Sequence, residues 1–87
     1  MKIKKGFVVR EIAGRSVVIA LGAASNSFKG MIELNGTARV IWDLLALGKD
    51  KSEIVDAIVS EYDVARETAD ADVDNFIEAL KGAGVLE

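Results

Sequence analysis

Apolar residues in this chain recur first at every second position and later at every third or fourth position. The β-branched runs 7–13 (FVVREIA) and 16–21 (SVVIAL) are separated by Gly14-Arg15, and this spacing predicts a hairpin with a tight turn. The second run is apolar on both faces, so we expect it in the middle of the sheet. Residues 22–30 (GAASNSFKG) are small and polar and predict a loop, from which Phe28 is expected to plug the core. Residues 31–34 (MIEL) predict a third strand, short enough to be an edge strand.

The remainder of the chain has a helical period. Asn35 is expected to cap a helix that runs to Leu47, and its apolar residues cover well over half of its circumference, which is typical of a buried central helix. Asp50 and Glu53 predict a capping box for a second helix, which ends near 62–63. A third helix is expected from about 65 to 83, with its buried stripe formed by Ala69, Val73, Phe76, Leu80 and Ala83. The order β-β-β-α-α-α predicts a single domain over residues 1–87, a winged-helix-like α+β fold in which a three-stranded antiparallel sheet is followed by a three-helix bundle.

Composition excludes several kinds of chemistry. The chain contains no Cys and no His, so thiolate catalysis, disulfides and the commonest general base and metal ligand are absent. The net charge of −3 conceals an asymmetry. Residues 1–30 contain six basic residues and one acidic residue, whereas residues 31–87 contain five basic and thirteen acidic residues. This asymmetry is explained either by ordinary solvated faces or by a bipolar surface that meets charged partners at two places.

The motifs along the chain resemble those of the PqqD family, the small proteins of pyrroloquinoline-quinone synthesis. They are F-K-G-M-I-x-L-N at 28–35, I-W-D-L-L at 41–45, E-I-V at 53–55, Y-D-V at 62–64, D-V-x-x-F-I-x-x-L at 72–80 and G-V-L at 84–86, after an N-terminal hairpin. The resemblance implies a non-catalytic protein without cofactor or metal. It would hold the leader segment of a ribosomally made precursor peptide and present the peptide to a modifying enzyme, often a radical S-adenosylmethionine enzyme. In the family the leader adds as a strand to the third strand and lies between it and the third helix.

This resemblance and the residue pattern together predict a peptide site. Its strand part is Met31, Ile32, Glu33 and Leu34, and its helix part is a row of Arg66, Asp70, Val73, Ile77 and Lys81 beside the buried stripe. From the residues alone, two other interpretations stay open: Lys29 and Glu33 protect the strand edge against aggregation, and the helical row is an ordinary amphipathic boundary. The pattern does not show which strand amides face outward. Asp72, at the other margin of the stripe, is expected to bond a backbone group.

The main alternative is a DNA-binding winged helix of a transcription regulator. Its third helix would enter the major groove, but here that helix carries five acids against Arg66 and Lys81, so we expect DNA to repel it. An enzyme is not expected either, because alternate acids on a helix, such as Asp70, Asp72 and Asp74, diverge and cannot converge on one metal. We therefore expect a cytoplasmic peptide-binding protein that contacts neither nucleic acid nor membrane, and is a monomer or a homodimer.

Overall fold

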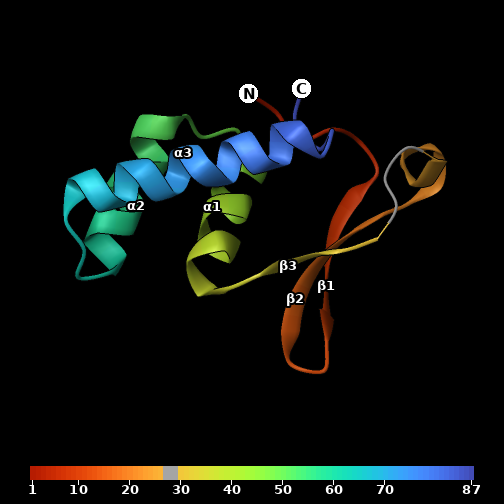
Figure 1. Cartoon of the computed structure of the whole chain (residues 1–87), viewed down its shortest axis with the longest axis horizontal. Coiled ribbons are helices and arrows are strands. Elements are labelled where there is room, and N and C mark those ends of the chain that lie inside the picture. The colour runs from red at the N-terminus through yellow and green to blue at the C-terminus, as the bar shows by residue number, and fades with distance from the viewer. Residues whose placement is uncertain (27–29) are drawn as a thin grey trace.

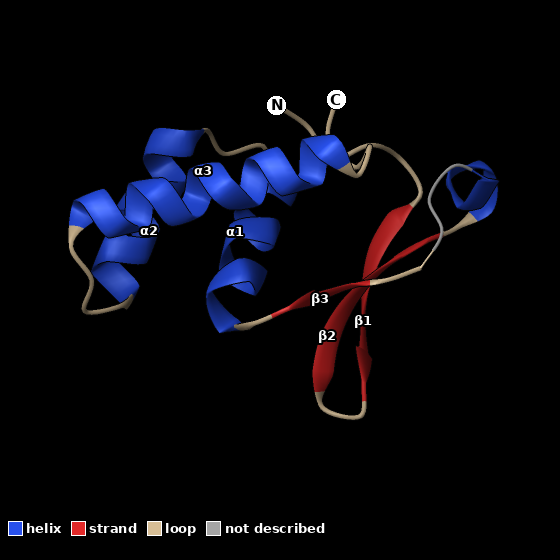
Figure 2. Cartoon of the chain, in the orientation of Figure 1, coloured by secondary structure: helices blue, strands red, loops and turns tan. Residues whose placement is uncertain are grey.

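The computed structural model describes residues 1–26 and 30–87 of the chain. Within them, three antiparallel strands are followed by three α-helices, so the predicted α+β order is confirmed (Figures 1 and 2). The elements are β1 (Phe7–Ile12), β2 (Arg15–Ala20), β3 (Ile32–Leu34), α1 (Gly36–Ala46), α2 (Lys51–Glu61) and α3 (Arg66–Gly82). The predicted loop after β2 contains a short 3-10 helix, η1 (Gly22–Asn26). The expectations for Phe28 and Lys29 concern residues outside the described ones.

The sheet has the order β1-β2-β3, which confirms β2 as the middle strand and β3 as an edge strand. The turn between β1 and β2 consists of Ala13 and Gly14, with φ of 52° and 79°. Two central residues with positive φ are typical of a type I′ turn, whose twist matches that of the paired strands. Gly14 adopts this backbone without a steric penalty, whereas the Cβ of Ala13 makes it unfavourable.

The helices gather on one side of the sheet, and the tip of the hairpin projects away from them (Figure 1). The core between helices and sheet contains Trp42 of α1, which is only 4% exposed, and this burial confirms α1 as a central element. The two chain ends lie side by side near the end of α3 (Figure 1): Val85 and Leu86 are buried, and Leu86 forms a bridge with Ile3. All the helices therefore use the sheet face that carries Val18 and Leu34.

Local capping explains where the helices begin. The Asn35 side chain accepts a hydrogen bond of 2.8 Å from the amide of Ala38, so the predicted cap of α1 is confirmed. Asp50 and Glu53 form the predicted capping box at the start of α2. At α3 the N-cap position is held by Ala65, which makes no capping bond, and the helix begins there nonetheless. Packing of α3, rather than its cap, must therefore supply its stability.

The buried stripe of α3 differs from the predicted one at two positions. It consists of Ala69, Val73, Ile77 and Leu80. Phe76 is half-buried and Ala83 is exposed, so the placement of both in the buried stripe was wrong. Phe76 and Ile77 are adjacent and differ by 100° around the helix axis, and α3 is rotated so that Ile77 enters the core.

Candidate functional site

The outer edge of β3 has no neighbouring strand within the described residues, and the direction of its backbone groups follows from the hairpin. In a two-residue hairpin the residues that flank the turn, Ile12 and Arg15, form a hydrogen-bonded pair. Hydrogen-bonded and non-bonded pairs then alternate along an antiparallel ladder. The amide of Leu21 donates to the carbonyl of Gly6 at 2.7 Å, which agrees with this alternation at the far end of the hairpin. The backbone N–H and C=O groups of the odd-numbered residues of β2 therefore point toward β1, and those of Ser16 and Val18 point toward β3.

This alternation decides which groups of β3 point outward. Ile32 and Leu34 lie opposite Val18 and Ser16, so their amides and carbonyls bond β2. Glu33 lies opposite Val17, and its N–H and C=O point to the open edge. The single outward donor and acceptor inside this strand thus belong to Glu33, and strand addition uses groups of this kind.

The side chains of residues 31–34 alternate between the core and the solvent. Leu34 is buried and Ile32 packs against the core, while Met31 is 64% exposed. The carboxylate of Glu33 lies 3.5 Å from Arg15, and both side chains are largely exposed. An exposed pair of this kind contributes little to stability, so the importance of Glu33 rests on its backbone.

A groove of about 410 Å³ lies between the first turns of α1, together with its cap Asn35, and the middle of α3. It is lined by Asn35, Thr37, Ala38, Ile41, Asp72, Asn75 and Phe76. Ile41 and Ala38 give it an apolar floor from the first turns of α1, and Phe76 gives an apolar wall from α3. Its lining begins at Asn35, which directly follows β3 in the sequence.

Among the described residues that line this groove, Asp72 alone is ionisable. Its side chain is exposed, and among the described residues it has neither a hydrogen bond nor an ion pair. The expectation that Asp72 bonds a backbone group was therefore wrong. The helical pattern placed it correctly beside Phe76, but α1 opposite offers it an open groove instead of a backbone donor.

The predicted helical row of the site faces elsewhere. Arg66 pairs with Asp56 of α2, and Asp70 lies 3.1 Å from Lys51, also of α2. The paired carboxylates raise the pKa of Arg66 and of Lys51. This side of α3 is therefore its contact with α2, since α2 and α3 pack together.

The remaining members of the row are no closer to the groove. Val73 is fully buried and Ile77 is 5% exposed, and both belong to the core, so the prediction that they line an open groove wall was wrong. Lys81 is exposed and lies 3.7 Å from Glu78 of its own helix. The sequence pattern missed the groove residues of α1, Thr37 and Ala38, although their position after the Asn35 cap was a usable signal.

A second hollow, of about 400 Å³, lies on the other side of Asn35. Arg39 of α1 spans it, donating to Glu11 at 2.8 Å, to Ser16 at 3.0 Å and to Asp43 at 3.0 Å. The hydrogen bond from Ser16, followed by that from Arg39, lowers the pKa of Glu11, and the bond to Asp43, followed by that to Glu11, raises the pKa of Arg39. The polar groups here satisfy one another, so this network braces the hairpin against α1.

The described residues contain no group of three or more side chains suited to hold a metal ion. They also contain no helix that is both long and apolar enough to cross a membrane.

Known proteins share the sequence pattern and the fold of this chain. The family model for PqqD, coenzyme PQQ synthesis protein D, matches residues 15–86. The solved structure of TbiB1 in complex with the TbiA(beta) leader peptide is 36% identical over 100% of this chain and 95% of that chain, with a TM-score of 0.82. Lasso peptide synthetase B1, solved in complex with a leader peptide, is 22% identical over 99% of this chain and 95% of that chain, with a TM-score of 0.81, and shares the fold. No match was found among curated proteins.

Proposed function

The chain belongs to the PqqD family, and we propose that it binds the leader segment of a ribosomally made precursor peptide as an added strand on β3. The observation that carries this proposal is the outward backbone of Glu33, two residues before Asn35, at which the groove between α1 and α3 begins. An extended peptide gains main-chain hydrogen bonds at such an edge, and its alternate side chains reach adjoining pockets. TbiB1, which is 36% identical, is bound to a leader peptide in its structure, and this supports the same class of ligand here.

The position of the groove supports one part of α3 as the peptide contact. Met31, Ile32, Glu33 and Leu34 remain our proposed strand contacts. On α3 the proposed contacts are Asp72, Asn75 and Phe76 in place of the row from Arg66 to Lys81, because only the former line the groove. The function is binding: the peptide is held without any bond being made or broken.

A titration followed by amide chemical shifts tests the mode of binding. The probes are the TbiA(beta) leader peptide, the ligand of the 36% identical protein, and leader segments of short reading frames beside this gene. We expect shifts to concentrate in residues 31–35 and around Asp72 to Phe76. Shifts confined to residues 2–15 would contradict strand addition to β3.

A bound leader leaves the rest of the precursor free, so we propose that the protein presents it to a modifying enzyme. From the family resemblance we expect a radical S-adenosylmethionine enzyme in the cytoplasm. The test is to purify the enzymes encoded beside this gene and to measure precursor modification with and without the protein. Equal rates in both cases would contradict presentation.

DNA binding, the other function that the helical order suggests, is disfavoured by charge. The exposed acids of α3 include Glu67, Asp72 and Glu78, and within the described part of the chain no cation from another element pairs with them. A helix with this surface would be repelled by the phosphates that dominate affinity for DNA.

A further inference from the structure

The groove beside β3 combines an apolar interior with one isolated negative charge, and this combination points to the kind of side chain it receives. Ile41 is buried at its base, and Phe76 presents a half-buried ring. The side-chain oxygen of Asn35 is already engaged by the amide of Ala38 at 2.8 Å. Asp72 is the residue at the groove with an unused carboxylate.

The other acids on this part of α3 are neutralised within the protein. Asp70 and Asp74 share Lys51, at 3.1 Å and 2.7 Å, on the side that faces α2. Glu78 lies 3.7 Å from Lys81. Among the described residues, no Lys or Arg lies within ion-pair distance of Asp72, so none of them neutralises its charge.

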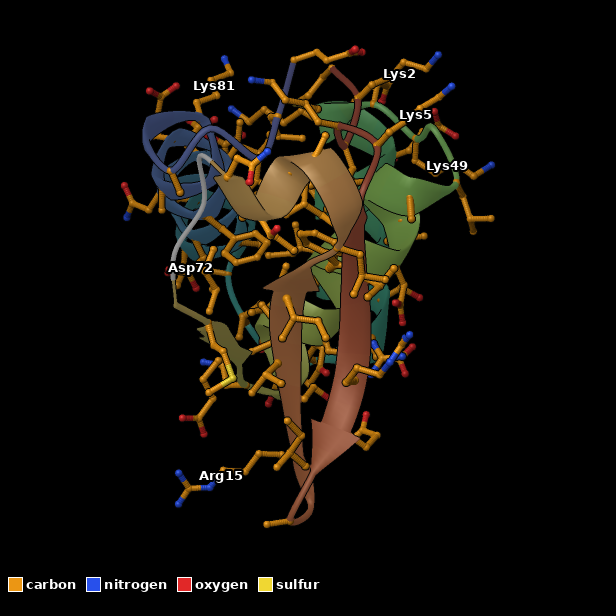
Figure 3. All side chains as sticks on the ribbon, turned by 90° about the vertical axis from the view of Figure 1, so that its right-hand side faces the viewer. Lys2, Lys5, Arg15, Lys49, Asp72 and Lys81 are labelled. Carbon is orange, nitrogen blue, oxygen red and sulfur yellow. The ribbon has the colours of Figure 1, made fainter. Side chains whose placement is uncertain are left out.

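Among the described residues, the cations labelled in Figure 3 either lie on the opposite flank from Asp72 or have another partner. Figure 3 labels Lys2, Lys5 and Lys49 on the flank opposite Asp72. Lys81 and Arg15 are labelled on the same flank as Asp72, but they lie 3.7 Å from Glu78 and 3.5 Å from Glu33. Asp72 therefore adds to the negative field of residues 31–87, which contain thirteen acidic and five basic residues.

A peptide lying over the groove would remove water from Asp72, and a carboxylate that loses water without gaining a partner opposes binding. A lysine or arginine side chain removes this penalty, because its head donates to the carboxylate while its methylene stem covers the apolar wall. The ring of Phe76 also attracts a nearby cation. An acidic side chain at the same position would be repelled.

We propose that Asp72 selects a lysine or arginine side chain at one position of the bound peptide. This inference rests on the proposed function, since it concerns the ligand of the same groove. It goes beyond that function by assigning a charge preference to a single residue.

Asp74 provides a matched control for Asp72. The two residues are two positions apart on α3 and point in directions about 200° apart. Asp72→Asn and Asp74→Asn change the net charge equally, but only Asp72 lines the groove, while Asp74 faces Lys51. An effect of overall charge would appear in both variants, and an effect of the groove only in Asp72→Asn.

The test begins with a displayed library of random 12-residue peptides selected on the wild-type protein. We expect selected peptides to share a Lys or Arg at one position and to shift the amide of Glu33. In a synthetic copy of the best binder, norleucine replaces that cation and keeps the apolar stem. We expect this change to weaken binding to the wild type and to Asp74→Asn about tenfold, the scale of a charge-assisted hydrogen bond. With Asp72→Asn the two peptides should bind nearly equally.

The outcomes separate this proposal from the proposed function. Selected peptides that shift Glu33 but share no basic residue would overturn the role of Asp72 and leave strand addition standing. A lysine preference that persists in Asp72→Asn, or that disappears equally in Asp74→Asn, would do the same. A selection that yields no peptide binding at β3 would overturn both. Asp72 is exposed and makes no contact that its replacement would remove, so thermal unfolding should show the variant as stable as the wild type.

Discussion

Replacing Glu33 by proline tests whether the partner is held by the backbone of β3. Proline has no N–H donor, and it is tolerated at a strand edge whose amide faces solvent. The free protein should therefore remain folded, since the amide of Glu33 points away from β2. The complex should lose the hydrogen bond that this amide gives to the added strand.

The magnitude follows from the groups involved. One main-chain hydrogen bond is worth about 0.5–1.5 kcal/mol net, and a peptide carbonyl left without a donor at the edge raises the loss to about 1–3 kcal/mol. This corresponds to a dissociation constant about 5- to 150-fold higher. The ion pair of Glu33 with Arg15 is lost as well, so Glu33→Ala is the control. It keeps the N–H and should bind almost as the wild type does, because exposed pairs contribute about 0–1 kcal/mol.

Ile32→Pro, in contrast, should destabilise the folded protein. Its amide lies in the ladder opposite Val18, which is fully buried, so the substitution leaves a carbonyl of β2 without its donor. We expect unfolding free energy to fall by about 1–3 kcal/mol. Isothermal titration with a leader peptide measures binding, and urea unfolding measures stability. Equal binding by Glu33→Pro and Glu33→Ala, or a folding loss in Glu33→Pro as large as that in Ile32→Pro, would refute the assigned backbone directions.

Three further substitutions test the fold that supports the site. Trp42→Ala should cost about 3–5 kcal/mol in urea unfolding, because the ring is 4% exposed in the core, and a loss under 1 kcal/mol would contradict the role of α1 as the central helix. Ala13→Asn should stabilise the protein by up to about 1 kcal/mol, since asparagine before Gly14 accepts positive φ in a type I′ turn; a lower melting temperature would count against that turn. Ala65→Asp should raise the melting temperature by giving α3 the missing cap, worth about 0.5–2 kcal/mol, and no change would mean that the helix end frays.

The element order was predictable because each signal in it is local. Alternating β-branched residues, the Asn35 cap and the Asp50–Glu53 capping box act over a few neighbouring positions, and the structure has all of them. The edge position of β3 followed from its length. The loop after β2 was less predictable, because η1 has no capping signal and consists of small residues (GAASN).

The face of α3 that meets the groove could not be obtained in the same way. Phe76 and Ile77 are both apolar, and a step of one residue turns the helix by 100°, so either fits a buried stripe. The choice depends on the rest of the fold: Ile77 joins the common core, and α2 fixes another side of α3 through the ion pairs of Arg66 with Asp56 and of Asp70 with Lys51. Contacts between residues distant in the sequence decide which of the two side chains is buried, and the spacing of residues along one helix gives no information about such contacts.

The direction of the Glu33 backbone shows how a site can depend on a distant turn. The two-residue turn at Ala13 and Gly14 makes its flanking residues a hydrogen-bonded pair, and this sets the alternation along β2. The alternation in β2 in turn decides that Val17 faces β1, so its partner Glu33 directs its amide and carbonyl outward. With β3 only three residues long, a shift of one position in this register would replace one outward residue by two and would also move Leu34 from the core face to the solvent face. Burial of Leu34 therefore stabilises this register, and the register in turn keeps the N–H and C=O of Glu33 directed to the open edge.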